Sequence, residues 1–478
     1  MSVLGILYWL SRIIAIVAII HVVLDNRQPA KTMAWALVIY FIPIFGVIFY
    51  IFFGVNYRKE RFISRRSMDM LTKRSMLEFV EQRQLDVPEA YESTIDLFID
   101  QSFSLPFINK KADILVSGYE FFPSLLADIA KAKSHIHIDM YIFEDDALGR
   151  LISDALIDKA RQGVEVRVIY DDVGCWKVKG RFFERMRKEG IDVEPFMPVR
   201  FPQFTSKANY RNHRKIIVID GHVGYIGGMN IASRYVKGRK KKKENEATKE
   251  GWRDTMVRLE GGGVNGLQRA FLIDWYFVDR TLLSDRKYYT KPEDEGGLLQ
   301  TVTSGPVATY PEIMQGYVRL IMAAKKYIYM ETPYFLPTDS VFFAMKTAAA
   351  SGVDVRVMVP RGSDAWFVEW ASRSYLREAA EAGIKINLYE GGFLHSKLMV
   401  CDDQVCTCGS TNVDFRSFEN NFEGNVFFYD TDLTIRMRDV FLHDEQQSVP
   451  LSSLHDRMHP HIVRRLWDSL TRLLSPLL

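Results

Sequence analysis

Cysteine is scarce in this chain, which has only four in 478 residues. Cys401, Cys406 and Cys408 are flanked by apolar residues, which is typical of packed thiols in a reducing compartment. The sequence contains neither a paired Cys–His spacing nor an H-E-x-x-H segment, and its acidic residues form no clustered triad. It therefore predicts no metal site and no cofactor.

Charge is missing altogether from residues 33–54, and residues 3–24 carry Arg12 as their only Lys or Arg. Each run is 22 residues long, which is enough to span a bilayer core of ~30 Å. A signal peptide would explain the first run, but no small-residue cleavage site follows it and a second apolar run does. We therefore expect a transmembrane hairpin over residues 1–56. A shallow re-entrant hairpin is the alternative, because Arg12 is costly at mid-bilayer and Pro43 allows the second run to kink.

The formal net charge is only +3, so the whole chain is not a polycation, but its basic residues are clustered. Between Asn56 and Arg74 there are seven Lys or Arg and two acidic residues. Such a flank is cytoplasmic by the positive-inside tendency, and it attracts anionic lipid headgroups. We assign residues 57–110 to a basic juxtamembrane linker and expect the rest of the chain on the cytoplasmic side.

The remainder of the chain is organised by a repeat. Residues 118–146 and 311–339 both read as an amphipathic helix followed by an alternating strand. A helix and two further strands led by glycine come next, at 163–172 and 190–196 in one copy and at 352–362 and 383–389 in the other. Strands that alternate with helices predict an α/β sheet, and the repeated order indicates an internal duplication. We set the two halves at residues 111–295 and 296–445.

A polar motif of the form H-x-K-x4-D-x6-G-x-x-N opens the next strand of each half. Its two copies are offset by 182 residues, since 395 − 213 = 182. The paired positions are His213 and His395, Lys215 and Lys397, Asp220 and Asp402, Gly227 and Gly409, and Asn230 and Asn412. Side chains alternate across a strand, so the His and the Lys share one face and the Asp lies on the other. A duplicated core would repeat glycines and apolar residues, but it has no need to repeat a His–Lys pair, so the motif indicates a functional site.

The doubled motif resembles the signature of the phospholipase D superfamily. Similarity to the bacterial cardiolipin synthases of that superfamily lies in NRQPAKTMAWALVIYFIPIFG, RNHRKIIVID, GGMN, WRDTMVRLEG, LHSKLMVCD, GSTNVDFRSF and SPLL. This resemblance implies two pseudo-symmetric α/β halves packed face to face around one active site. It also implies a multi-pass enzyme of the bacterial cytoplasmic (inner) membrane. Its reaction would convert two phosphatidylglycerol molecules into cardiolipin and glycerol through a phosphohistidine intermediate.

Phosphodiester chemistry explains why such a site holds lysines and imidazoles. The substrate's negative charge repels nucleophiles, and the departing alkoxide is a poor leaving group. Lys215 and Lys397 can neutralise the non-bridging oxygens. One imidazole can attack phosphorus while the other protonates the leaving group and later deprotonates the incoming alcohol. The spacing leaves the two roles open, and the resemblance implies that His213 is the nucleophile and His395 the acid and base.

The remaining polar residues of the motif are expected to support these groups. Asp220 and Asp402 belong to the family's catalytic signature, but their strand parity favours a structural role, in which they fix backbone or pair with a base. Asn230, Asn412 and Ser410 are expected to donate hydrogen bonds to phosphate oxygens or to shape the pocket.

A working imidazole also needs an acceptor that holds its far nitrogen. The family places carboxylates downstream of each motif. On that basis we assign Glu423 to His395, and Asp254 to His213, so that each pair lies within one half.

Two further segments are basic or amphipathic. Residues 237–249 contain seven Lys or Arg and two Glu, and form either a solvated loop or a surface for anionic headgroups. The C-terminal tail, residues 446–478, is expected to contain either a packed terminal helix or an interfacial helix. Its apolar stripe consists of Ile462, Leu466, Leu470 and Leu473, while Arg464, Arg465 and Arg472 lie off it.

The expected partners are phosphatidylglycerol and other anionic membrane lipids, and a homo-oligomer is one option for assembly. A nuclease is disfavoured by the hairpin and by the lack of an interleaved aromatic–basic strand, so no nucleic-acid partner is expected. A hydrolase or another head-group transferase would use the same core, because the sequence does not select the acceptor alcohol. The two intact motifs argue against a membrane-bound binding protein without activity.

Overall fold

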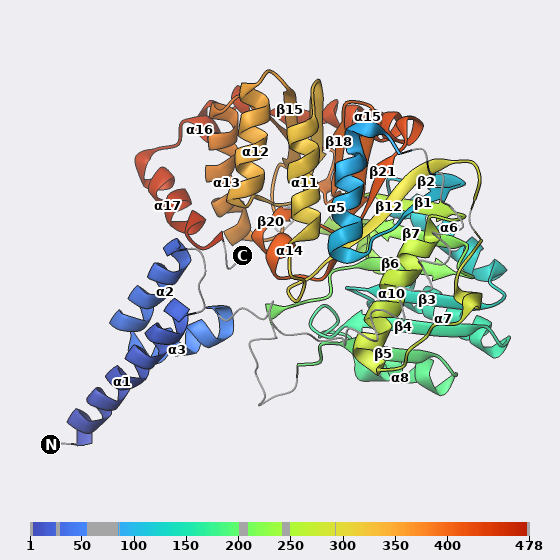
Figure 1. Cartoon of the computed structure of the whole chain (residues 1–478), viewed down its shortest axis with the longest axis horizontal. Coiled ribbons are helices and arrows are strands. Elements are labelled where there is room, and N and C mark those ends of the chain that lie inside the picture. Colours follow the sequence, from blue (N-terminus) through green and yellow to red (C-terminus); the bar gives the residue numbers. More distant parts are fainter. Residues whose placement is uncertain are drawn as a thin grey trace. The chain divides into compact units, whose positions relative to one another are not determined.

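The computed structural model of the chain describes residues 3–24, 29–54, 85, 87–199, 209–240, 249–291 and 293–475. It contains two compact units, which are considered in turn. The N-terminal helices belong to the first unit, and the α/β body forms the second (Figure 1).

The N-terminal unit contains α1 (Val3–Leu24), α2 (Pro29–Phe41), α3 (Pro43–Phe49) and the π-helical turn η1 (Tyr50–Gly54). The first two helices pack against each other through Ala15, Val22 and Ile39, which are buried. The guanidinium group of Arg12 donates a hydrogen bond to the carbonyl of Tyr40 at 2.7 Å, so its charge is partnered inside this unit.

Within the described residues, α1 is the single helix that is long and apolar enough to cross a membrane. The second apolar run does not form another such helix, because it breaks at Ile42, between α2 and α3. Pro43 lacks an N–H group and its ring clashes with the preceding helical turn. The basic segment 57–84 and residues 241–248 of the second basic cluster lie outside the described residues.

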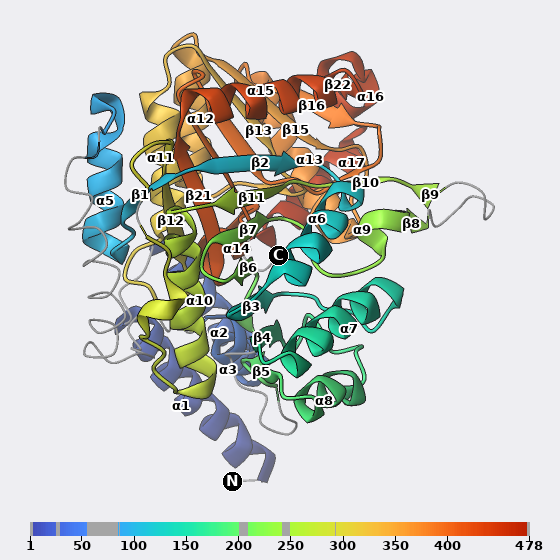
Figure 2. The same cartoon turned by 90° about the vertical axis from the view of Figure 1, so that its right-hand side faces the viewer.

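The first half of the α/β body is built on a seven-stranded sheet of order β2-β11-β7-β6-β3-β4-β5. Its parallel strands are β3 (His135–Met140), β4 (Glu165–Asp171) and β5 (Asp192–Phe196). Its antiparallel strands are β6 (Lys215–Ile219), β7 (Val223–Gly227), β11 (Met256–Glu260) and β2 (Lys111–Leu115). The helices α6 (Gly118–Lys131), α7 (Ala147–Arg161) and α8 (Gly180–Lys188) lie on one side, and α10 (Val264–Asp279) lies on the other (Figure 2).

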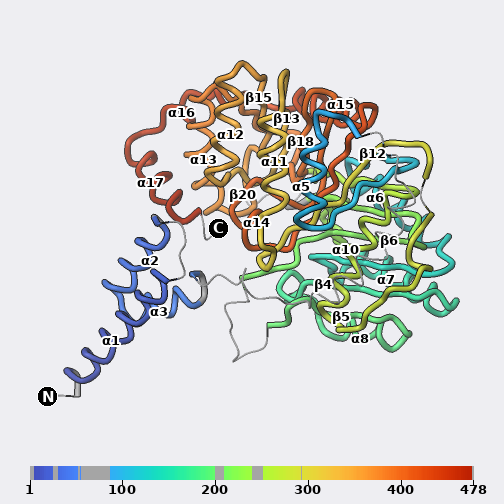
Figure 3. Tube along the Cα trace, in the orientation of Figure 1, coloured from blue at the N-terminus to red at the C-terminus, as the bar shows by residue number. Residues whose placement is uncertain are grey.

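The second half repeats this arrangement on a nine-stranded sheet of order β1-β12-β21-β19-β18-β13-β15-β16-β22. Its strands are β1 (Pro106–Asn109), β12 (Gly297–Ser304), β21 (Glu423–Tyr429), β19 (Val405–Gly409), β18 (Leu398–Cys401), β13 (Tyr327–Glu331), β15 (Asp354–Pro360), β16 (Lys385–Tyr389) and β22 (Ser448–Pro450). Its main helices are α11 (Glu312–Ala323), α12 (Asp339–Ala350), α13 (Trp366–Glu381), α15 (Thr431–Glu445) and α17 (Ile462–Arg472). Figure 3 traces the first half in cyan to yellow and the second in orange to red.

The shorter elements connect these layers. The helical ones are η2 (Glu89–Tyr91), α5 (Glu92–Ser102), α9 (Arg234–Lys237), η4 (Arg286–Tyr288), α14 (Phe415–Glu419), η5 (Leu451–Ser453) and α16 (His455–Met458). The short strands are β8 (Arg239–Lys240), β9 (Lys249–Glu250), β10 (Trp252–Arg253), β14 (Phe335–Leu336), β17 (Phe393–Leu394) and β20 (Val413–Asp414). Of the residues that we assigned to the linker, Glu92–Ser102 form α5 and Pro106–Asn109 form β1, which pairs with β12 of the second half.

The two sheets pack face to face, as the resemblance implies. One continuous core joins Ile216 and Val218 of β6 to Leu398 and Val400 of β18. Alternate residues of β6, such as Ile217, face α6, α7 and α8. Each motif strand is therefore buried on both faces, which explains its unbroken apolar run. The four cysteines are buried and free, in agreement with the expectation of packed thiols.

Candidate active site

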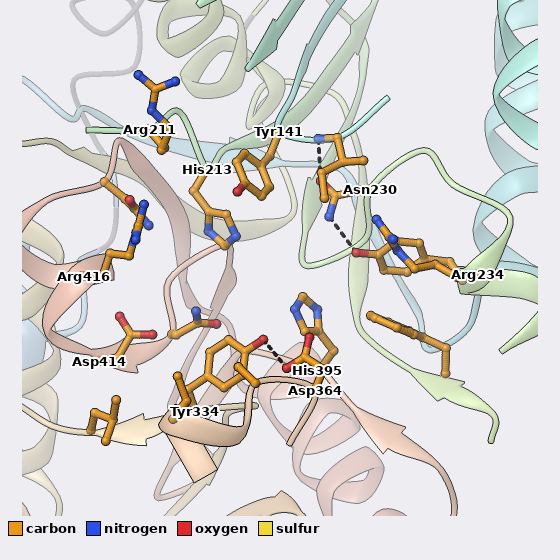
Figure 4. A pocket seen from close by; sticks show the side chains of 18 residues that line it. Tyr141, Arg211, His213, Asn230, Arg234, Tyr334, Asp364, His395, Asp414 and Arg416 are labelled. Atoms are coloured by element: carbon orange, nitrogen blue, oxygen red, sulfur yellow. Dashed lines mark hydrogen bonds between the residues drawn. The ribbon is translucent and has the colours of Figure 1, made fainter. Parts of the chain in front are cut away.

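Both motif histidines line one cavity of about 500 Å³ (Figure 4). His213 lies just before β6, and His395 lies just after β17, so each comes from the start of its motif strand. The first half contributes Asn230 to the wall, and the second half contributes Asn412. The two motif copies, which are 182 residues apart in sequence, thus contribute to one site between the halves.

The histidines are held by carboxylates of the opposite halves, which corrects our assignment. His213 Nδ1 lies 3.0 and 3.1 Å from the carboxylate oxygens of Glu423. His395 Nδ1 lies 2.7 Å from Oδ2 of Asp254. Both pairs therefore cross between the halves, whereas we expected each within one half.

Backbone pairing between the halves is the physical reason for this crossing. The N–H of His213 donates to the carbonyl of Phe422 at 2.9 Å, and the N–H of His395 donates to that of Arg253 at 2.7 Å. In each case the acceptor is the residue just before the carboxylate. The strand β10 runs parallel to β17, and Asn212 bridges to Phe422 in the same sense. Each carboxylate is thereby delivered to the histidine across the interface.

Burial has the largest effect on the pKa values of the two imidazoles and of Glu423. It lowers the pKa of His213 to about 4, although Glu423 acts in the opposite direction. Burial together with Lys397 lowers the pKa of His395 to about 4. Burial alone would raise the pKa of Glu423, but contact with His213 and the charge of Lys215 outweigh it and leave that pKa lowered. At neutral pH the site therefore holds neutral imidazoles on ionised carboxylates.

The two lysines are buried beside the histidines. Lys215 Nζ donates to the carbonyl of His213 at 2.6 Å, and Lys397 Nζ lies 2.8 Å from Nδ1 of His395. Burial lowers the pKa of Lys215 to about 7, and it also lowers the pKa of Lys397. Burial would raise the pKa of Asp254, but Lys397 and His395 reverse the shift and hold it below its usual value. An anionic substrate would offset the cost of burying these ammonium groups.

The two motif aspartates are not brought to the cavity. Asp220 accepts hydrogen bonds from the N–H groups of residues 133–135 at 2.8–3.0 Å. Asp402 does the same for residues 325–327 at 2.6–2.8 Å. Both occupy the left-handed region, with φ of 54° and 56°. They fix the backbone at the starts of β3 and β13, as their strand parity predicted.

The three expected hydrogen-bond donors differ in their surroundings. Asn230 is held by the N–H of Ile142 at 3.0 Å and by the hydroxyl of Tyr235 at 2.6 Å, so it shapes the wall. Asn412 lines the cavity, and its side-chain oxygen has no hydrogen-bond partner among the residues that the structure describes. Of the two roles that we expected for Ser410, the second fits its contact, because its hydroxyl donates to Glu423, which in turn holds His213.

The first half has Gly228 at the position equivalent to Ser410, since both donate their N–H to the strand that carries the carboxylate. A Cβ atom at Gly228 would lie 2.0 Å from Oδ1 of Asp254. The glycine therefore makes room for the shorter carboxylate, whereas the serine hydroxyl holds Glu423. The two half-sites are thus built differently around the same His–carboxylate pair.

Three arginines that the motif did not select also line the cavity. Arg211 and Arg416 lie on one side of it, and Arg234 lies on the other (Figure 4). Arg211 is buried and donates to the carbonyl of Met197 at 3.2 Å. Arg211 stands two residues before His213, so a search for basic residues flanking the motif would have found it.

Comparisons with known proteins agree with this geometry. A family model described as "Cardiolipin synthase, PLD-like domain" matches residues 125–252 and 317–445, which is more than half of the chain. A second model, "Phospholipase_D-nuclease N-terminal", matches residues 13–54.

Curated relatives match along the whole chain. A cardiolipin synthase of Oceanobacillus iheyensis is 37% identical over 489 aligned residues and is covered completely, as is this chain. One from Geobacillus kaustophilus is 39% identical over 95% of this chain and 90% of its own length. A crystal structure of phosphatidylserine synthase from Haemophilus influenzae covers 81% of this chain and 100% of its own, with a TM-score of 0.62 at 15% identity, which shows the fold. The chain belongs to the bacterial cardiolipin synthases of the phospholipase D superfamily.

Proposed function

We propose that this enzyme transfers the phosphatidyl group of one phosphatidylglycerol to a second one, which yields cardiolipin and glycerol. The observation that carries the proposal is the single cavity lined by His213 and His395, each held by a carboxylate of the opposite half. The curated relatives bear the name of this activity and match the full chain.

In the first step, Nε2 of His213 attacks phosphorus, and the bond from phosphorus to the glycerol oxygen breaks. His395 gives its proton to that oxygen, so glycerol leaves as a neutral alcohol. The charges of Lys215 and Lys397 balance the non-bridging oxygens. The bound phosphodiester supplies a negative charge that raises the pKa of His395, which favours its protonated form for this role.

In the second step, a hydroxyl of another phosphatidylglycerol attacks phosphorus and the P–N bond breaks. His395 takes the proton of that hydroxyl, so both imidazoles return to their starting states. The acceptor brings a second phosphodiester charge close to the first. Arg211 and Arg416, on one side of the cavity, are suited to receive it, because guanidinium groups bind phosphate oxygens in pairs (Figure 4).

The membrane placement is part of the proposal. We assign the apolar residues 1–56 to a hairpin that either spans the cytoplasmic membrane or enters it from the inner side. The length of α1 supports membrane insertion, and the basic residues 56–74 support a cytoplasmic catalytic body.

The purified full chain in phosphatidylglycerol vesicles should release glycerol and cardiolipin in equal amounts, and His213→Ala should release neither. With phosphatidyl-p-nitrophenol, whose leaving group needs no proton, a His395→Ala variant should accumulate lipid covalently bound to protein, because the intermediate cannot be resolved efficiently. Phosphatidic acid as the main product would overturn the proposal in favour of a hydrolase, since water would then be the acceptor.

A further inference from the structure

The C-terminal helix α17 is amphipathic, but its polar side faces the protein. The residues it buries are Asp468 and Thr471, and Ser475 just beyond it is buried as well. A helix that docks on a soluble domain ordinarily buries its apolar stripe. The orientation of α17 is the reverse of that expectation.

The apolar side of α17 and of the residues just after it is exposed. The exposed fractions are Ile462 69%, Val463 68%, Leu466 60%, Trp467 48%, Leu470 48%, Leu473 74% and Leu474 41%. With 3.6 residues per turn, these seven side chains fall within an arc of about 140° opposite Asp468. The side chains therefore form one continuous apolar face, which we call the α17 face.

Ion pairs hold this orientation. Asp468, which is fully buried, lies 2.7 Å from Arg377 of α13. Arg472 lies 2.7 Å from Glu378, and its guanidinium carbon lies 3.9 Å from the ring centre of Tyr375. Turning the helix to bury its leucines would break these contacts. The exposure of the α17 face is thus built into the packing of α17 on α13.

The α17 face continues to the rim of the active-site cavity through aromatic rings. Trp467 stands edge-on to Trp370 at 5.5 Å between ring centres, and Trp370 stands edge-on to Trp366 at 4.7 Å. Trp366 and Phe367 are 52% and 37% exposed. Their neighbours Asp364, Ala365 and Val368 line the cavity that holds the two histidines.

We propose that the α17 face, together with Trp366 and Phe367, inserts into the interface of an anionic bilayer beside the active-site cavity. Tryptophan prefers the headgroup level of membranes, and amphipathic helices lie in this plane when basic residues border their apolar face. Arg464 and Arg465 are exposed at that border. The function of this contact, to present lipid headgroups to the cavity, rests on the proposed transfer between two phosphatidylglycerols.

The first test measures insertion directly and does not depend on catalysis. The four natural cysteines are buried, so Leu466→Cys can be labelled selectively with an environment-sensitive fluorophore. The full chain would carry His213→Ala to keep the lipids unchanged, in vesicles of equal parts phosphatidylglycerol and phosphatidylcholine. Leu151→Cys on α7 is the matched control, since Leu151 is an exposed leucine (50%) on another helix.

We expect blue-shifted emission at position 466 and strong quenching by lipids with a nitroxide near the headgroup, with neither effect at 151. Equal, weak quenching at the two positions would overturn the proposal. A second copy of the chain could cover the α17 face instead of a bilayer. In that case the emission at position 466 would shift with protein concentration in lipid-free detergent, and the nitroxide lipids would not quench it. That result would also overturn the proposal.

The second test separates this contact from the chemistry. Leu466→Gln with Leu470→Gln should lower kcat/KM on vesicles roughly tenfold or more, because each change weakens apolar partitioning. Activity on a short-chain phosphatidylglycerol below its micelle concentration should stay unchanged. An equal loss on both substrates would overturn the role of the α17 face, whereas a parent enzyme that makes no cardiolipin on either would overturn the proposed function alone.

Discussion

The crossed pairing makes Glu423→Gln the most informative substitution in this enzyme. It removes the negative charge beside His213 while keeping the shape of the side chain. Asn421 donates to Oε1 of Glu423 at 3.1 Å, which favours the amide oxygen of the new glutamine at that position. His213 Nδ1, 3.0 Å from the same atom, can therefore still donate a hydrogen bond, but to a neutral acceptor.

The expected loss follows from this change of acceptor. A hydrogen bond to a charged group contributes about 1.5–3 kcal/mol, against about 1 kcal/mol for a neutral one. The positive charge that develops on His213 as it bonds to phosphorus loses that difference in stabilisation, about 0.5–2 kcal/mol. Since about 1.4 kcal/mol corresponds to a tenfold change in rate, formation of the phosphoenzyme should slow by roughly 2- to 30-fold.

The assay is rapid-quench release of the leaving group in the first turnover, with Asp254→Asn as the matched variant. Asp254 holds His395, the proposed acid. The slowing caused by Asp254→Asn should therefore disappear with phosphatidyl-p-nitrophenol, because the leaving group of this substrate needs no proton. The slow step of Glu423→Gln should remain with that substrate, because its nucleophile is impaired. If the p-nitrophenyl substrate restored Glu423→Gln and left Asp254→Asn slow, our assignment of the two histidines would be refuted.

Four further outcomes are expected. Burial lowers the pKa of Lys215 to about 7, so kcat/KM should fall as the pH rises through about 7, where the ammonium group loses its proton. Lys215→Arg should shift this fall to higher pH in a pH–rate profile. A fall at the same pH in the variant would contradict the assignment of this titration to Lys215. Gly228→Ser should lower turnover roughly 100-fold by displacing Asp254, whose Oδ1 would lie 2.0 Å from the new Cβ, and near-normal turnover would show that the site can relax. Asp220→Asn should lower the free energy of unfolding by about 1–3 kcal/mol in urea titrations, with kcat of the folded enzyme little changed; the opposite result would argue for a catalytic role. Arg416→Gln should raise KM for phosphatidylglycerol roughly tenfold in steady-state transfer while first-turnover glycerol release stays normal, and a slowed first turnover would contradict its role at the acceptor phosphate.

The sequence carried the identity of the reacting groups but not their partners. His213 and His395 could be found because a polar pair repeated at a fixed offset inside apolar strands has no structural explanation. The carboxylate partner of each histidine could not be predicted, because both Glu423 and Asp254 follow a motif in their own half at a plausible distance. The choice depends on which strands meet across the interface, and that is a property of the packed halves.

The same limit applies to α17, but not to the second apolar run. The period of Ile462, Leu466 and Leu470 predicts an amphipathic helix but does not say which face is buried. The buried pair of Asp468 with Arg377 decides that, and their separation along the chain hides it. Pro43, by contrast, was a local signal, and its effect on the second run follows from the chemistry of proline alone.

The residue between His and Lys, which differs between the two motif copies, also links the two halves at the site. In H-x-K, position x is Arg214 in one half and Ser396 in the other, so the repeat does not predict a role for it. Both residues lie just before their motif strands, β6 and β18, and both contact the opposite half. Arg214 Nε donates to the carbonyl of Glu423 at 3.0 Å, and the hydroxyl of Ser396 lies 2.8 Å from that of Thr255, next to Asp254.

Each motif strand therefore presents its histidine to a carboxylate and uses the next residue to fix the strand that carries this carboxylate. The residue type at position x differs because the contact differs. The long guanidinium group of Arg214 reaches the backbone of β21, while the short hydroxyl of Ser396 is long enough to contact Thr255. Both histidines have their carboxylate and their backbone hydrogen-bond acceptor in the opposite half. The duplicated halves are thus one catalytic unit, and a substitution in the core between the sheets should alter both imidazoles together.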